Sequence, residues 1–118
     1  MQTICVPLEL WIGATFILPV RIVDADGFPI NVDGYAAKME VRQTVNSTDP
    51  AIITASTANG FIGLDGENGI FQVILPDTYT SLLTPLCKAK WDFFIYSPQG
   101  IVTRIVGGTI DILESVTR

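Results

Sequence analysis

The chain has 118 residues, of which 48% are hydrophobic and 16% charged, and its formal net charge is −5. This length and apolar content predict one folded domain with a substantial core, and they exclude a disordered chain. The 7 Lys and Arg residues form no cluster, which excludes a protein that binds a phosphate backbone. The content of charged residues is below the average of about 25%, which indicates a surface that is partly covered by partner proteins.

The N-terminal quarter predicts two strands that lie at sheet edges. Residues 3–10 contain Pro7, and residues 15–24 contain Pro19. Proline cannot donate to a sheet ladder, so each strand is expected at an edge or next to a bulge.

The most apolar run of the chain, from Leu8 to Val20, is shorter than the roughly 20 residues that a membrane-spanning helix needs, and it contains Glu9 and Pro19. The residues before it lack the positive charge of a signal peptide. We therefore expect neither membrane insertion nor secretion.

The middle of the chain predicts half-buried strands. In residues 35–43, Ala37, Met39 and Val41 alternate with charged residues, as in a strand with one face in the core. Short strands are expected at 51–57 and 61–64. Residues 69–76 form a further strand with Phe71, Val73 and Leu75 on one face and Ile70, Gln72 and Ile74 on the other.

Residues 76–86 break this alternation. Pro76 followed by Asp77 can begin one helical turn, and Pro85 ends it. We expect the turn to carry the chain from one sheet to the other, with Leu82 and Leu83 packed against the core.

The C-terminal segment predicts a hairpin. Residues 89–97 place Trp91, Phe93 and Ile95 on one face, and the following SPQG has the pattern of a type I turn. Residues 101–106 and 109–114 are two strand halves around Gly107–Gly108. A glycine pair inside a strand predicts a bulge or a sharp bend, after which Ile110 and Ile112 face the core.

Together these elements predict an all-β fold, an immunoglobulin-like antiparallel β-sandwich with one short helical turn near 77–83. No domain boundary or internal repeat is apparent, so residues 1–118 are expected to form one domain.

Candidate chemistry is sparse. The chain has no His, the usual general base, so we expect no enzyme, no catalytic residue and no cofactor. Asp24, Asp26 and Asn31 offer oxygen ligands, but their spacing does not match a calcium loop, and Asp and Asn in turns usually bond their own backbone. We therefore expect no metal site. Cys5 and Cys87 allow one disulfide at most, and without secretion we expect them to be free and buried.

Three aromatic residues are candidates for a protein–protein interface. If Trp91 faces the core, Phe94 and Tyr96 lie on the opposite face, where they suit a protein–protein contact. Two alternatives remain open: the faces are reversed, or neighbouring strands cover both. Trp11, in the apolar N-terminal run, is the third candidate.

The closing segment, WDFFIYSPQGIVTRIVGGTIDILESVTR, resembles a group of small bacteriophage and prophage structural proteins. The segments TFILPVRIVDADGFPINVDGYAAKMEVR and STANGFIGLDGENGIFQVILPDTYTSLL are similar to the same group, so the resemblance spans nearly the whole chain in order. In particular, the chain resembles the N-terminal domain of phage baseplate upper proteins, a β-sandwich that anchors receptor-binding parts to the tail.

The resemblance implies a non-enzymatic virion protein at the tail, baseplate or fibre attachment, made in the host bacterial cytoplasm. Its partners would be other virion proteins and further copies of itself, with neither nucleic acid nor membrane bound. Two alternatives remain open, a capsid decoration protein and a carbohydrate-binding sandwich that uses Trp11 or Tyr96 as a stacking platform.

Overall fold

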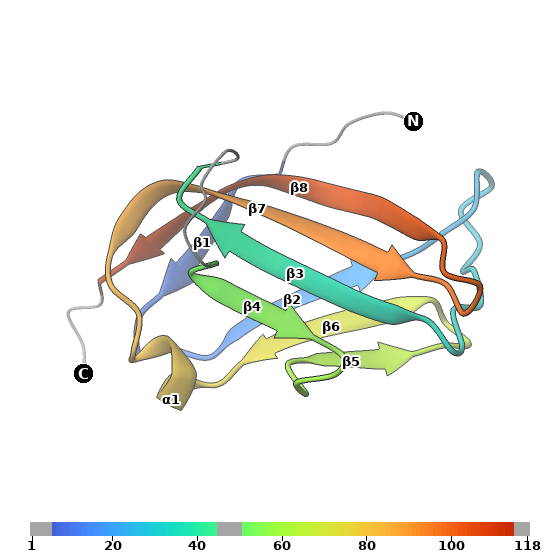
Figure 1. The fold of residues 1–118 in the computed structure, drawn as a ribbon, viewed down its shortest axis with the longest axis horizontal. Coiled ribbons are helices and arrows are strands. Elements are labelled where there is room, and N and C mark those ends of the chain that lie inside the picture. Colours follow the sequence, from blue (N-terminus) through green and yellow to red (C-terminus); the bar gives the residue numbers. More distant parts are fainter. Residues whose placement is uncertain (1–5, 45–50, 115–118) are drawn as a thin grey trace.

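The computed structural model describes residues 6–44 and 51–114, which form eight strands and one short helix (Figure 1). The described elements, in chain order, are β1 (Leu8–Trp11), β2 (Phe16–Arg21), β3 (Ala36–Arg42), β4 (Ile53–Ser56), β5 (Ile62–Asp65), β6 (Ile70–Leu75), α1 (Asp77–Thr80), β7 (Leu86–Tyr96) and β8 (Val102–Leu113). No helix in this part of the chain is long and apolar enough to cross a membrane.

The strands form two sheets that pack face to face, which confirms the predicted all-β sandwich (Figure 1). One sheet has the order β1-β8-β7-β3-β4 and the other the order β2-β6-β5. In immunoglobulin nomenclature these are the G, F and C strands (β8, β7, β3) facing the B, E and D strands (β2, β6, β5). The sandwich departs from a purely antiparallel one at β1, which runs parallel to β8.

The core consists of alternate side chains from both sheets. Met39 and Val41 on β3, Phe93 on β7 and Phe71 on β6 point inward and are buried. For β6 the sequence predicted only which residues share a face. Phe71 and Phe93 meet edge to face between the sheets, with ring centroids 5.7 Å apart. Period-two patterning therefore decides which face of each strand is buried.

The helical turn lies at the predicted place and carries the chain from β6 in one sheet to β7 in the other. The buried Thr80 fixes it, because its Oγ1 donates to the Ala14 carbonyl at 2.9 Å and accepts from Gly13 N at 3.2 Å. Leu83 packs against the core as expected. The prediction for Leu82 was wrong: its side chain is 80% exposed, because α1 ends at Thr80 and its single turn leaves Leu82 outside.

The strands that the two prolines mark lie at edges, as predicted: Pro7 directly precedes β1, and Pro19 lies within β2. β1 ends the five-stranded sheet and β2 ends the three-stranded sheet. Pro19 stands opposite Gln72 on β6, with its ring on the outer face.

The glycine pair in β8 has a different role from the predicted one. The bulge lies at Ile105, while Gly107 and Gly108 pair regularly with Asp92 and Trp91 of β7. A Cβ atom on Gly108 would lie 2.6 Å from the backbone nitrogen of Val6. The glycine therefore lets the segment before β1 cross β8 at backbone contact distance.

Two hydrogen bonds hold that crossing. Val6 N donates to the Gly107 carbonyl at 2.9 Å, and the indole Nε1 of Trp91 donates to the Val6 carbonyl at 3.0 Å. Beyond the pair, Ile110 and Ile112 are buried as expected.

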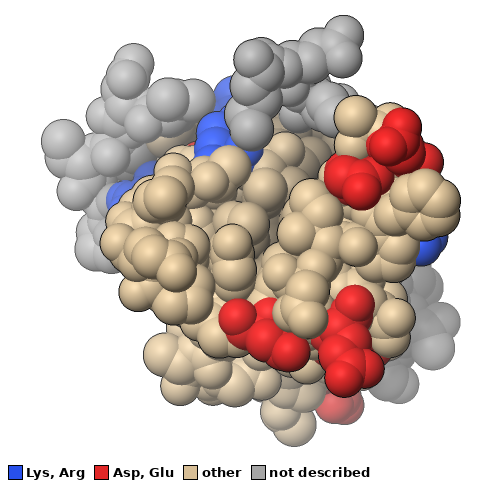
Figure 2. All heavy atoms as spheres, turned by 90° about the vertical axis from the view of Figure 1, so that its right-hand side faces the viewer, with Lys and Arg blue, Asp and Glu red and all other residues tan. Residues whose placement is uncertain are grey.

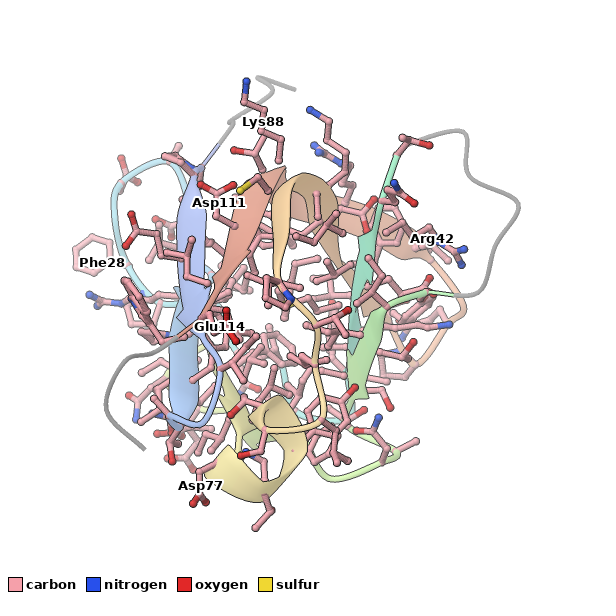
Figure 3. All side chains as sticks on the ribbon, turned by 90° about the vertical axis from the view of Figure 1, so that its left-hand side faces the viewer. Phe28, Arg42, Asp77, Lys88, Asp111 and Glu114 are labelled. Carbon is pink, nitrogen blue, oxygen red and sulfur yellow. The ribbon has the colours of Figure 1, made fainter. Side chains whose placement is uncertain are left out.

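The prediction that Cys87 is buried was wrong, because Cys87 is free and exposed. The pairing of β7 with β8 shifts register between Leu86 and Ala89, so the alternation slips there. Lys88 adopts a positive φ of 60° in this bulge, and its amide donates to Asp111 Oδ1 at 2.7 Å (Figure 3). Cys5 lies outside the described residues.

Candidate functional site

Three connecting segments meet at one end of the sandwich. They are residues 22–35 between β2 and β3, residues 66–69 between β5 and β6, and residues 97–101 between β7 and β8. We call this surface the loop end; it faces the viewer in Figure 2.

The longest segment of the loop end is held by its own turn chemistry. Asp24 Oδ1 accepts from the amides of Asp26 and Phe28, at 2.9 and 3.0 Å, and Asp24 N donates to the Phe28 carbonyl. Asn31 Oδ1 accepts from Asp33 N in the same way. These bonds confirm that the acidic residues build turns, and the described residues contain no group of acidic side chains arranged to hold a metal ion.

Backbone hydrogen bonds join two of the three segments of the loop end. Ile22 N donates to the Gly69 carbonyl at 2.7 Å, and Val32 N donates to the Gly66 carbonyl at 2.8 Å. The Val32 side chain is buried beneath them. The segment 22–35 is thus tied to the turn of the opposite hairpin at two points.

The loop end exposes large apolar side chains. Phe28 and Ile101, from different segments, are 66% and 65% exposed, and three neighbours along the chain are also exposed: Val23, Ile30 and Val102. None of these residues was among the predicted interface residues. The sequence does contain a signal for them. Phe28 in DGFP and Ile101 in QGIV are large apolar residues within turns, where a side chain is not expected to reach the core.

The charge at the loop end has one sign. Residues 22–35, 66–69 and 97–101 contain Asp24, Asp26, Asp33 and Glu67 but no Lys or Arg. Figure 2 shows carboxylates in groups around a largely uncharged centre. An apolar centre with a charged rim is the usual composition of a protein-binding surface.

The structure places all three predicted interface residues on the outer face of the five-stranded sheet. Phe94 and Tyr96 are half-buried there, and Tyr96 stands opposite the exposed Val102, next to the loop end. Trp11 is 47% exposed and pairs with Leu113, at the other end of β8. The fold thus brings Phe94 and Tyr96 together and separates them from Trp11.

A charged hollow of about 500 Å³ lies between these aromatic positions. Glu40 and Asp92 stand opposite each other on β3 and β7, and Glu40 forms ion pairs with Arg42 at 3.0 Å and Lys38 at 3.8 Å. Arg104 completes the cluster from β8. Among the described residues that line the hollow are Thr109 and Lys90, and none is a Ser, Cys or His.

The pKa of Asp92 is raised above its ordinary value of 3.8, chiefly because partial burial disfavours the charged carboxylate. Arg104 opposes this effect, Glu40 adds to it and Arg42 opposes it. The folded state therefore binds the Asp92 proton more tightly than the unfolded state does. The resulting loss of stability is absent below pH 3.8 and develops as the pH rises through the folded-state pKa.

Asp92→Asn should consequently raise Tm at pH 7, because it removes a charge that folding disfavours, and leave Tm unchanged at about pH 3. Thermal unfolding followed by circular dichroism at both pH values measures the difference. Asp26→Asn, in an exposed turn, is the control for the loss of one carboxylate. A lower Tm for Asp92→Asn at pH 7 would show that the attraction of Arg104 and Arg42 for the Asp92 carboxylate outweighs the cost of burying its charge.

Comparison of the chain with models of known protein families and with curated proteins found no match.

Proposed function

We propose that this chain is a non-enzymatic structural subunit of a bacteriophage particle, positioned at the tail, baseplate or fibre attachment and acting through protein–protein contacts. The observation that carries the proposal is the loop end, where apolar side chains from separate segments are exposed on a hydrogen-bonded frame. Such a surface is suited to docking against a neighbouring protein without rearrangement.

The outer-face aromatics extend this contact surface. Tyr96 and Val102 adjoin the loop end, and Phe94 follows along β7. A partner seated on the loop end can reach them without crossing the charged hollow. A capsid decoration protein would use the same surface, so the location in the particle separates the two assignments.

The carbohydrate-binding alternative receives less support from the geometry. Trp11 on β1 and Tyr96 on β7 pair with opposite ends of β8, so a sugar would have only one of the two rings to stack on. The charged hollow lies between them.

The proposal is tested on particles released by the cells that make this chain. The particles are purified on a density gradient, their proteins are identified by mass spectrometry, and an antibody to the chain locates it by electron microscopy. We expect several copies per particle, with label at the tail. Label on the head alone would support the decoration protein, and a chain absent from the particles would overturn both.

The loop end is tested with Phe28→Ser/Ile101→Ser. Both side chains are mostly exposed, so Tm should change little, while incorporation into particles should fall about tenfold or more because two apolar anchors are lost. Leu82→Ser is the matched control, since Leu82 is also mostly exposed but lies beside α1 at the other end (Figure 1). Equal incorporation of both variants would contradict a docking role for the loop end.

The second variant, Phe94→Ser/Tyr96→Ser, tests the outer-face aromatics. We expect it to impair incorporation more than folding, because both side chains are only half-buried. Unfolding of this double variant at room temperature would show that the two residues act mainly in the fold.

A further inference from the structure

The outer face of the three-stranded sheet is a second uncovered surface, separate from the loop end. Most residues of this face are exposed, and Tyr79 of α1 packs on it at one corner. Its side chains are those that alternate with the core residues of β2, β6 and β5. We call it the β6 face, and its residues are Ile17, Pro19, Arg21, Phe61, Gly63, Asp65, Ile70, Gln72 and Ile74.

Strand register arranges these residues in three rows across the sheet. The first row is Ile17, Ile74 and Phe61; the second is Pro19, Gln72 and Gly63; the third is Arg21, Ile70 and Asp65. β6 supplies the central member of every row.

The first row is the apolar one. Ile17 and Ile74 are direct cross-strand partners and are 54% and 40% exposed. The Phe61 ring beside them packs on Tyr79, with centroids 4.9 Å apart. Two exposed isoleucines that adjoin across strands form a patch that water solvates poorly.

The third row carries opposite charges on its two outer strands. Arg21 forms no ion pair with another residue in the described part of the chain. Asp65 accepts from Asn68 Nδ2 at 2.9 Å and is otherwise exposed. Ile70 separates the two charges within one sheet.

We propose that the β6 face binds the same face of a second copy of this chain, about a two-fold axis that runs along β6. Such an axis places β2 of one copy over β5 of the other. Arg21 then faces Asp65 of the second copy in both directions, Ile17 faces Phe61, and Pro19 faces the small Gly63. Ile70, Gln72 and Ile74 each meet their own counterpart on the axis.

The pattern of the rows selects this axis over the other in-plane one. A two-fold axis perpendicular to β6 would lay the charged third row on the apolar first row. That arrangement would bury Arg21 against Ile17 and Asp65 against Phe61, with no partner for either charge, which is unfavourable. Two packed sheets are usually rotated by about 30° relative to each other, which moves the corners of the two faces apart. The long Arg21 side chain can still reach Asp65 of the second copy across this displacement.

The size of the β6 face indicates a weak dimer. Its residues are fewer than the roughly 20–30 per side of a standard stable interface. The turn that carries Glu67 follows β5 in both copies at the same end, and its like charge opposes association. We expect a dissociation constant between about 10 μM and 1 mM. This affinity is sufficient for dimers to form where many copies are held close together, because their effective concentration is then high.

The test uses sedimentation equilibrium of the full chain from about 10 μM to 1 mM. Arg21→Asp and Asp65→Arg should each weaken self-association about tenfold or more, because like charges then face each other in both contacts. An equimolar mixture of the two variants should associate as the parent chain does. In that heterodimer each of the two contacts again joins one carboxylate and one guanidinium group.

The mixture separates this geometry from other contacts. A parent chain that stays monomeric at the highest concentration, single variants that associate like the parent, or a mixture that stays monomeric would each overturn the proposal. If either variant fails to fold, Gln72→Glu and Gln72→Lys replace the pair. Gln72 meets its counterpart on the axis, so each variant should be monomeric and their mixture dimeric. These measurements involve no particle, so their outcome is independent of the proposed function.

Discussion

Phe93→Ala should lower the free energy of unfolding by about 3–5 kcal/mol, the usual cost of removing a buried aromatic ring. Phe93 is fully buried on β7 and meets Phe71 of the opposite sheet edge to face. Its loss leaves a cavity between the sheets, which the rigid strands on both sides can fill only in part. Urea unfolding measures the change, and Tm should fall by at least about 12 °C.

Phe94→Ala is the matched control for this prediction. Phe94 is the next residue along β7 but points to the outer face and is half-buried. Its truncation should cost clearly less than that of Phe93. Equal costs for the two variants would mean that the inner and outer faces of β7 are assigned wrongly.

Gly108→Ala should destabilise the protein by about 2–4 kcal/mol. The added Cβ would lie 2.6 Å from Val6 N and 2.9 Å from the Val6 carbonyl carbon, so the segment before β1 must move away. That movement breaks the bond from Val6 N to the Gly107 carbonyl and leaves the indole N–H of Trp91 without its acceptor. The two losses together account for the expected range.

Gly63→Ala is the control for the glycine substitution itself. Gly63 also lies in a strand, but a Cβ there meets no atom within 4 Å. Its substitution should change the free energy of unfolding by less than about 1 kcal/mol. Hydrogen exchange adds a local readout, because Gly108→Ala should deprotect the amide of Val6 before those of β7. A Gly108→Ala variant as stable as Gly63→Ala would contradict the close crossing.

Much of the fold could be predicted because short-range pattern determines it. Alternation alone separated Met39, Phe71 and Phe93 from their neighbours on the opposite face, since neighbouring residues of a strand must face opposite sides. The structure buries all three. The prolines marked β1 and β2 as edge strands for an equally local reason, the missing amide donor.

The features that were missed depend on contacts between distant residues. Cys87 faces solvent because Lys88 adopts a positive φ and bonds to Asp111, which belongs to another strand. Gly108 is required by the path of Val6, far away in the sequence. Neither partner can be identified from the local sequence.

The candidate site was predicted in part, for a related reason. The alternation of β7 placed Phe94 and Tyr96 together on the outer face, as the structure shows. The loop end was missed because its apolar residues come from segments that the fold alone brings together, with Phe28 and Ile101 in different loops. Trp11 was grouped with Tyr96 although the strand register separates them.

The parallel pairing of β1 with β8 has a mechanical consequence. Traction applied to the chain before β1 and after β8 pulls two side-by-side strands in opposite directions along their own length. The residue pairs from Leu8–Ile110 to Trp11–Leu113 then share the load and must yield together, whereas an antiparallel terminal pair would be peeled open one bond at a time. Single-molecule stretching should therefore show a distinct force peak, which Gly108→Ala should lower.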